Sequence, residues 1–280
     1  MELNNLFEGI ANKAAEANPI MEDDYYNDDG LLMCGKCHTP KQVEIEIFGT
    51  KRRPMCLCKC ATEKRDAKEA ERRKRERLLH IQRLKSMGFP DLEMRNFTFE
   101  KDDHSNEKIS TVAKKYVDNF EEMNKNGKGL LLFGNVGTGK TFISACIANA
   151  LIEQGHPCLV TNFARLTNKI SGMYEGKQDY LDSLNNYDLL VIDDLASERD
   201  TEFMGEIVQT IIDARYRAKK PLIVTTNLTA EELKNPAEVR KQRIYSRLFE
   251  MCIPIEVKGK DRRKEKLKED YKKYDDILGL

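Results

Sequence analysis

Short apolar runs separated by helix-like stretches fill the last two thirds of the chain. Each run holds a few consecutive apolar residues between polar ones, which predicts strands, the central ones buried on both faces. The stretches between the runs space apolar residues three and four apart, as amphipathic helices do. Strands that alternate with helices predict an α/β domain with a parallel sheet flanked by helices. The predicted strands lie at 130–133, 158–161, 189–192, 221–228 and 251–257, and the predicted helices at 106–124, 142–151, 163–172, 199–219 and 240–249.

The first third of the chain has a different pattern. Helical spacing of the apolar residues within 3–14 predicts a short amphipathic helix, which an acidic arm follows. Residues 43–48 alternate like a strand and lead into a turn at Gly49. Residues 61–86 carry Glu and Lys or Arg four positions apart, which predicts an exposed helix that ends near Gly88. We therefore expect an N-terminal unit at 1–60, a charged helical linker at 61–87 and an α/β domain at 88–280.

Charge is balanced over the chain but unevenly distributed. The formal net charge is zero, while residues 61–85 hold ten Lys or Arg against five Asp or Glu. This stretch is either a solvated spacer or an arm that contacts phosphate backbones. The sequence has neither an apolar run of about 18 residues nor a basic segment leading into an apolar one, so we expect no membrane span and no signal peptide. We expect a cytoplasmic protein, whose thiols stay reduced.

Five of the eight cysteines fall within residues 34–60. In a reduced compartment this clustering favours metal ligands over disulfides. Cys34 and Cys37 form one C-x-x-C pair, and a second group about twenty residues later can complete a tetrahedral Zn²⁺ site. The predicted ligands of the second group are Cys58 and Cys60, with Cys56 as the alternate. The layout is that of a zinc ribbon, in which the metal supplies most of the folding free energy.

The strand at 130–133 leads into a glycine-rich loop and then an apolar helix. The loop fits G-x-x-x-x-G-K-[ST], and this context predicts a phosphate-binding Walker A loop. Its backbone N–H groups and the helix N-terminus attract phosphate oxygens. Lys140 can reach the β- and γ-phosphates, and the hydroxyl of Thr141 can bind Mg²⁺. The loop consists of Gly134, Asn135, Val136, Gly137, Thr138, Gly139, Lys140 and Thr141.

Polar residues end two later strands in the way that nucleotide hydrolysis requires. Asp193 and Asp194 follow the apolar run 189–192, which is the Walker B pattern. Asp193 can hold Mg²⁺, and Asp194 stands where many such ATPases have the Glu that orients the attacking water. Asn227 ends the next strand and is either a contact of the γ-phosphate or a common turn residue. Upstream, Phe97 is a candidate for the adenine pocket or for the core, as is Phe99 nearby.

Walker A, Asp193-Asp194, Val-Thr-Thr-Asn, Ser-Arg-Leu and a terminal Gly-x-x-x-Arg occur in this order. The set resembles the AAA+ subgroup of DnaC/DnaI-type replicative helicase loaders and IstB-type transposition helper ATPases, over about residues 88–265. The cysteine-rich N-terminal unit is similar to that of DnaI-type and phage-borne loaders.

The resemblance implies roles for further residues. Asn227 would be the sensor of the γ-phosphate, and Arg247 an arginine finger that reaches a neighbouring subunit, with Arg243 as second choice. Arg263 would be the second sensor, with Arg262 close behind, although the sequence here lacks the family's aromatic before the arginine.

The resemblance also implies a function. It implies an ATP- and Mg²⁺-dependent loader that self-associates, binds a hexameric replicative helicase through its zinc unit and delivers it onto single-stranded DNA. The alternatives are a transposition helper that binds duplex DNA and an NTP-binding switch without nucleic acid.

Overall fold

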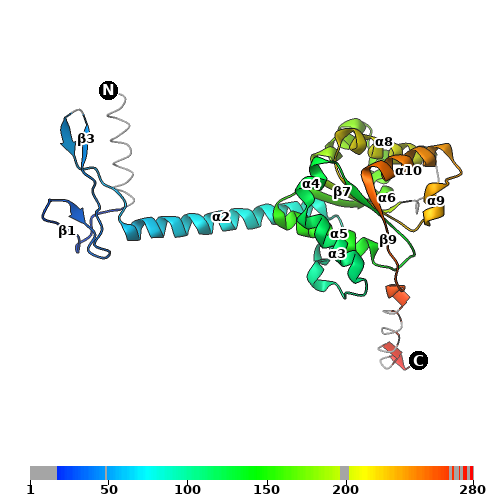
Figure 1. Ribbon diagram of the computed structural model, residues 1–280, viewed down its shortest axis with the longest axis horizontal. Coiled ribbons are helices and arrows are strands. Elements are labelled where there is room, and N and C mark those ends of the chain that lie inside the picture. Colours follow the sequence, from blue (N-terminus) through cyan, green and yellow to red (C-terminus); the bar gives the residue numbers. More distant parts are fainter. Residues whose placement is uncertain are drawn as a thin grey trace. The chain divides into compact units, whose positions relative to one another are not determined.

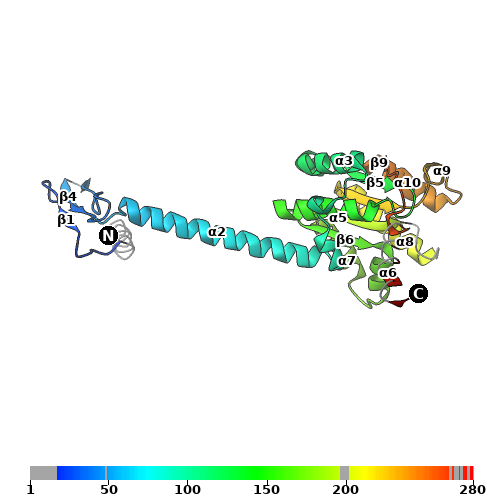
Figure 2. The same cartoon turned by 90° about the horizontal axis from the view of Figure 1, so that it is seen from below.

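The chain divides into two compact units, Met1–Leu79 and His80–Leu280. The computed structural model describes residues 18–47, 49–195 and 202–264, with a few positions beyond 264. The helix predicted within 3–14 lies outside these residues. The boundary between the units falls inside α2 (Lys59–Gly88), a single helix in Figure 2 that matches the predicted charged helix. The three-part division expected from the sequence stays a prediction.

A five-stranded parallel sheet forms the centre of the second unit, as the apolar runs predicted. The strand order is β6-β7-β8-β5-β9, and every neighbouring pair is parallel. The apolar strands bury both faces: Leu131 packs into one core cluster while Leu130 and Leu132 pack into the other. The strands are β5 (Gly129–Phe133), β6 (Cys158–Asn162), β7 (Leu189–Leu195), β8 (Leu222–Thr226) and β9 (Cys252–Glu256).

Helices cover both faces of this sheet (Figure 1). The core on one face takes its residues from α6, α7, α8 and α10, and the core on the other from α3, α4, α5 and the end of α2. The helices are α3 (Glu107–Asp118), α4 (Phe120–Lys125), α5 (Lys140–Gln154), α6 (Phe163–Ser171), α7 (Lys177–Ser183), α8 (Glu202–Ala218), α9 (Ala230–Lys234) and α10 (Val239–Met251), with 3₁₀ turns at Glu93–Asn96, Phe99–Lys101 and Leu184–Asn186.

Two features of this unit differ from the expectation. The helix predicted at 106–124 is interrupted at Asn119, whose side-chain amide donates to the carbonyl of Lys115 and ends α3. The short helices α7 and α9 were not predicted. At the start of α9, Thr229 and Glu232 form a capping box, a signal that was present in the sequence.

The first unit contains two small antiparallel pairs. β1 (Tyr25–Tyr26) pairs with β2 (Leu32–Met33), and β3 (Ile45–Ile47) pairs with β4 (Thr50–Arg52) across a turn at Gly49, as expected for a hairpin between cysteine pairs. Its buried polar pair is Lys41 with Asp24, whose side chains are each 1% exposed. So small a unit buries few apolar side chains, which leaves its stability dependent on other interactions. Among the helices described in either unit, none is both long and apolar enough to cross a membrane.

Candidate functional site

The Walker A loop joins β5 to α5 and encloses the amine of Lys140. Gly137 and Gly139 have φ values of 77° and 90°, which a residue with a side chain rarely adopts. Lys140 Nζ donates to the carbonyls of Gly134 and Asn135 at 2.8 and 2.7 Å, and to Asn227 Oδ1 at 2.9 Å. Burial lowers the pKa of Lys140. The loop therefore presents a cation whose orientation is set by its own backbone.

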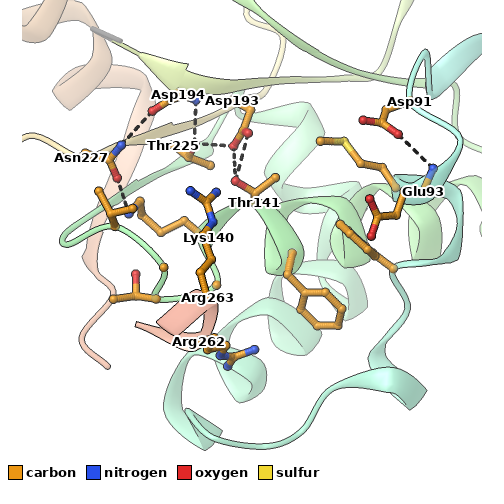
Figure 3. A pocket seen from close by; sticks show the side chains of 17 residues that line it. Asp91, Glu93, Lys140, Thr141, Asp193, Asp194, Thr225, Asn227, Arg262 and Arg263 are labelled. Atoms are coloured by element: carbon orange, nitrogen blue, oxygen red, sulfur yellow. Dashed lines mark hydrogen bonds between the residues drawn. The ribbon is translucent and has the colours of Figure 1, made fainter. Parts of the chain in front are cut away.

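Asp193, at the end of β7, is held by two hydroxyl groups. Thr141 donates to both of its carboxylate oxygens, at 2.8 and 3.0 Å, and Thr225 of β8 donates to Oδ1 at 2.6 Å. Burial raises the pKa of Asp193, since the charged form is poorly solvated there. Thr141 and Asp193, the two predicted Mg²⁺ ligands, therefore lie in direct contact (Figure 3).

Asp194 has a left-handed backbone, with φ of 62°. The β7–β8 register shifts between Ile192 and Leu195, so the backbone bends where the two carboxylates diverge. The N–H of Asp194 donates to Thr225 Oγ1 at 2.8 Å, and Asn227 Nδ2 donates to Asp194 Oδ1 at 2.9 Å. Such backbone strain concentrates at functional sites. Asn227 thereby links Asp194 to Lys140 in one hydrogen-bonded chain, as Figure 3 shows.

The four candidate arginines occupy different places. Arg262 and Arg263 both line the pocket beside the Walker A loop. Arg262 is paired with Asp103 and hydrogen-bonded to Ser105, whereas Arg263 points toward Lys140 in Figure 3. Arg247 and Arg243 lie on α10, away from the described lining of this pocket.

The residues of the site fit Mg²⁺-bound ATP. They surround a cavity of about 560 Å³. Its polar end offers backbone N–H groups, Lys140 and Arg263 for phosphate oxygens, and the oxygens of Thr141 and Asp193 suit Mg²⁺. A bound ATP would supply the phosphoryl group that is transferred, and Mg²⁺ would neutralise part of the negative charge on its phosphates. In that arrangement Lys140 and Arg263 would hold the phosphates, and the Asp194 carboxylate would be placed to orient a water molecule.

The other end of the cavity has an apolar wall that suits a base, with Asp91 and Glu93 at the same end (Figure 3). Phe97 and Phe142 lie with ring centroids 5.2 Å apart, beside Met94, and all three line the pocket. The amide of Asn149 on α5 donates to the carbonyls of Met94 and Phe97, which fixes this lead-in segment to the Walker A helix. Phe97 therefore contributes to the pocket. Phe99 packs against the core, as Phe97 also does.

Four cysteines converge in the N-terminal unit. The Sγ atoms of Cys34, Cys37, Cys58 and Cys60 all lie within 4.8 Å of one another, and Cys60 is 3.4–3.5 Å from each of the others. A tetrahedral Zn²⁺ with bonds of 2.3 Å would place its sulfur ligands about 3.8 Å apart, so the set fits this metal. Cys56 points to the carbonyl of Pro40 instead. A hydrogen bond from Thr39 lowers the pKa of Cys37 to about 5, which favours the thiolate that metals bind.

Sequence reasoning missed Thr225 and most of the base-binding end. Thr225 contacts the carboxylate of Asp193 and the backbone N–H of Asp194, and its position two residues before Asn227 on one strand face was the available signal. Met94, Phe142, Asp91 and Glu93 also line the pocket but match no motif.

A parallel sheet with a Walker A loop, paired strand-end carboxylates and a strand-end Asn defines an AAA+ P-loop protein that binds ATP. The chain belongs to the IstB-like ATP binding protein family, whose family model matches residues 60–270.

Curated relatives and solved structures agree with this class. The chain is 26% identical over 160 residues to the replicative helicase loader DnaI of Bacillus subtilis (strain 168), covering 53% of this chain and 51% of that protein. It is 27% identical over 208 residues to DnaC of Buchnera aphidicola subsp. Baizongia pistaciae, covering 71% and 81%. A DnaI crystal structure matches with a TM-score of 0.53 and 25% identity, covering 64% of this chain and 99% of that one. The chain spans about half the length of the B. subtilis relative.

Proposed function

We propose that this protein is an ATP-dependent loader that binds a replicative DNA helicase and delivers it onto single-stranded DNA. The observation that carries the proposal is the contact chain Lys140–Asn227–Asp194 beside Thr141–Asp193, within a fold similar to DnaI. The curated relatives that carry the name of replicative helicase loader support it.

ATP hydrolysis in this proposal controls release of the helicase. Lys140 and Arg263 hold the β- and γ-phosphates, Asp194 polarises the attacking water, and Asn227 senses the γ-phosphate. Arg247 of a neighbouring copy stabilises the charge of the transferring phosphoryl group. A single copy then hydrolyses ATP slowly, and self-association through the ATPase unit raises the rate.

In this proposal the N-terminal unit that contains the four cysteines binds the helicase. Zn²⁺ held by Cys34, Cys37, Cys58 and Cys60 gives that unit the rigidity that a docking surface needs. The charged helix α2 connects this unit to the nucleotide-binding unit.

A helicase-loading assay tests the proposal. The full chain is incubated with the host's hexameric helicase, ATP and circular single-stranded DNA, and helicase bound to the circles is measured after gel filtration. Loading is expected with the wild type and not with Lys140→Ala. Cys34→Ser with Cys37→Ser should abolish capture of the helicase while nucleotide binding persists. Circles that gain no helicase in the presence of the wild-type protein would exclude the loader function.

The transposition helper is the alternative, because the IstB-like family includes such ATPases. The cysteine cluster argues against it, since that role leaves the cluster unexplained. Stronger binding to duplex than to single-stranded DNA, together with no capture of the helicase, would favour the helper.

A further inference from the structure

A second cleft lies at the opposite edge of the sheet from the nucleotide site. It has a volume of about 510 Å³, and residues 125–128, 215–217, 219 and 250–251 line it. Lys128 directly precedes β5 and Lys219 shortly precedes β8, its parallel neighbour. Both therefore stand at the amino ends of the strands, whereas the Walker A loop and Asp193 follow the carboxyl ends.

Two tight turns in direct contact form the floor of this cleft. Gly127 and Lys219 both have positive φ values, 62° and 49°. A Cβ atom on Gly127 would lie 2.8 Å from the carbonyl group of Lys219, so the turns fit only with glycine at this position. Arg215 lies fully buried beneath them and donates to the carbonyl of Pro221. The cleft is thus a fixed feature of the fold.

Cations dominate the rim of the cleft. Lys125, Arg217 and Lys219 are exposed, and none of them forms an ion pair with a carboxylate in the described part of the chain. Lys128 Nζ donates to the carbonyl of Glu250 at 2.5 Å. The carboxylate of Glu250 is the acidic group of the lining, and it accepts from the hydroxyl of Tyr216 at 2.6 Å. The rim therefore carries a clear excess of positive charge.

Tyr216 gives this basic cleft an aromatic surface. Its side chain is 40% exposed although large aromatic side chains usually bury most of their area. Its hydroxyl is held by Glu250, and the guanidinium of Arg247 lies 6.0 Å from the ring centroid. The ring is therefore fixed in place while part of it remains open to solvent.

We propose that this cleft binds single-stranded DNA, with Lys125, Arg217 and Lys219 on the phosphates and Tyr216 stacked on a base. A cationic groove with an ordered, exposed aromatic is how proteins hold single strands without reading their sequence. The alternative ligand, an acidic segment of another protein, would pair with the cations but would not account for the exposed ring of Tyr216. The inference rests on the proposed loader function, for which it names the surface that receives the strand.

Charge removal at the rim is the first test. Lys125→Gln, Arg217→Gln and Lys219→Gln are combined, and the control combines Lys108→Gln, Lys115→Gln and Lys177→Gln, which are exposed cations elsewhere in the same unit. Affinity for labelled oligo-deoxythymidine is measured by fluorescence anisotropy with ATP and Mg²⁺, at several salt concentrations. The rim variant should bind about tenfold or more weakly and lower the log–log salt slope by about 2, since each phosphate contact on a single strand contributes about 0.7.

Substitution of Tyr216 is the second test. Tyr216→Ala should weaken oligo-deoxythymidine binding by about 5- to 150-fold, the range that corresponds to about 1–3 kcal/mol for a stacking aromatic, and Tyr216→Phe should bind like the wild type. Binding of a fluorescent ATP analogue should be unchanged in both variants, because the nucleotide site lies at the other edge of the sheet; this confirms that each variant is folded.

The outcomes separate the cleft from the loader function. If the rim variant binds oligo-deoxythymidine as the control variant does, the cleft assignment is wrong, although helicase capture by the wild type would still support a loader. If Tyr216→Ala and Tyr216→Phe bind oligo-deoxythymidine with the same affinity, no stacking occurs and the assignment fails. It also fails if Tyr216→Ala weakens binding to duplex DNA as much as binding to single-stranded DNA. If the rim variant loses helicase capture and keeps its DNA affinity, the cleft is a protein-docking surface and the assignment also fails.

Discussion

Thr225 links the Asp193 carboxylate to the backbone of Asp194 near the carboxyl end of β7. Its hydroxyl donates to Asp193 Oδ1 at 2.6 Å and accepts from the N–H of Asp194 at 2.8 Å. One oxygen atom therefore sets both the side chain that would hold Mg²⁺ and the left-handed backbone of the residue that would polarise water. Positioning of this kind is worth as much to an active site as the residues that touch the substrate.

Thr225→Val keeps the shape of the side chain and removes the hydroxyl. We expect the affinity for ATP with Mg²⁺ to fall, and single-turnover hydrolysis to slow about tenfold or more, because a hydrogen bond to a charged group is worth about 1.5–3 kcal/mol. Thr226→Val is the control, since the Thr226 hydroxyl donates to the carbonyl of Leu195 rather than to a carboxylate. Equal hydrolysis rates in the two variants would mean that Thr225 serves only the packing of the strand.

At the scale of elements, α8 is fastened to the sheet by a buried arginine. Arg215 is fully buried, and its guanidinium donates to the carbonyls of Leu184, Tyr187, Asp188 and Pro221. Burial lowers the pKa of Arg215 to about 10, so the group stays charged at neutral pH. These carbonyls precede β7 and β8, whose far ends carry Asp193 and Asp194 and lead into Asn227.

Arg215→Met should leave those buried carbonyls without donors. We expect the ATPase unit to lose about 3 kcal/mol or more of stability, since each unpaired buried polar group costs about 1–3 kcal/mol. For a unit of this size the melting temperature would fall by about 6–12 °C. Arg217→Met, two residues along the same helix and exposed, should change stability by less than about 0.5 kcal/mol. Scanning calorimetry of the two variants decides whether the buried arginine holds the helix to the sheet.

The elements with long apolar runs could be predicted from the sequence, and those decided by local polar contacts could not. All five strands were predicted. Burial on both faces leaves a continuous apolar run in β5, β7 and β8, such as Leu189–Ile192, whereas β9 is a mostly exposed edge strand that still carries apolar residues. The break at Asn119 depends on one side-chain hydrogen bond, which competes with the helix. The strand order depends on contacts between distant segments, and a periodicity carries no information about these.

The candidate site shows the same division. The Walker A loop and the carboxylates after β7 could be predicted because each is a local motif at the end of an apolar run. Whether Arg262 or Arg263 faces the nucleotide depends on Asp103 and Ser105, which lie far away in the sequence and hold Arg262. Likewise, the Phe97–Phe142 pair joins the lead-in segment to α5, where Asn149 donates to the carbonyl of Phe97, and these residues lie far apart in the sequence.

For the whole molecule, the division into two units predicts separate responses to loss of metal. The N-terminal unit is small, and its four-cysteine cluster fits Zn²⁺, whereas the ATPase unit has two extensive apolar cores of its own. Treatment of the full chain with a chelator should release about one equivalent of Zn²⁺ and expose residues 18–58 to protease. Nucleotide affinity should not change. If the chelated protein also lost its affinity for the ATP analogue, the two units would not fold independently.

At the scale of the whole molecule, the proposed self-association would affect hydrolysis through Arg247. Arg247 lies outside the described lining of its own chain's nucleotide pocket and forms an ion pair with Asp213 of α8. Arg243, one helical turn earlier, is exposed. If an arginine at this position serves hydrolysis, it must therefore act on the pocket of another copy. Arg247 would then leave its ion pair with Asp213 and contact the phosphoryl group of that copy's nucleotide.

Mixing two inactive variants tests action between copies. Lys140→Ala lacks a working pocket but keeps Arg247, while Arg247→Ala keeps the pocket and should still bind ATP. Each alone should show little stimulated hydrolysis, since an arginine finger is worth about 10³–10⁵ in rate. Their mixture should recover activity, because an intact pocket can then meet an intact finger, and Arg243→Ala alone should behave like the wild type. If Arg247→Ala kept full stimulated turnover and Arg243→Ala lost it, the arginine finger would be Arg243. If the mixture stayed inactive, the arginine would act within its own chain.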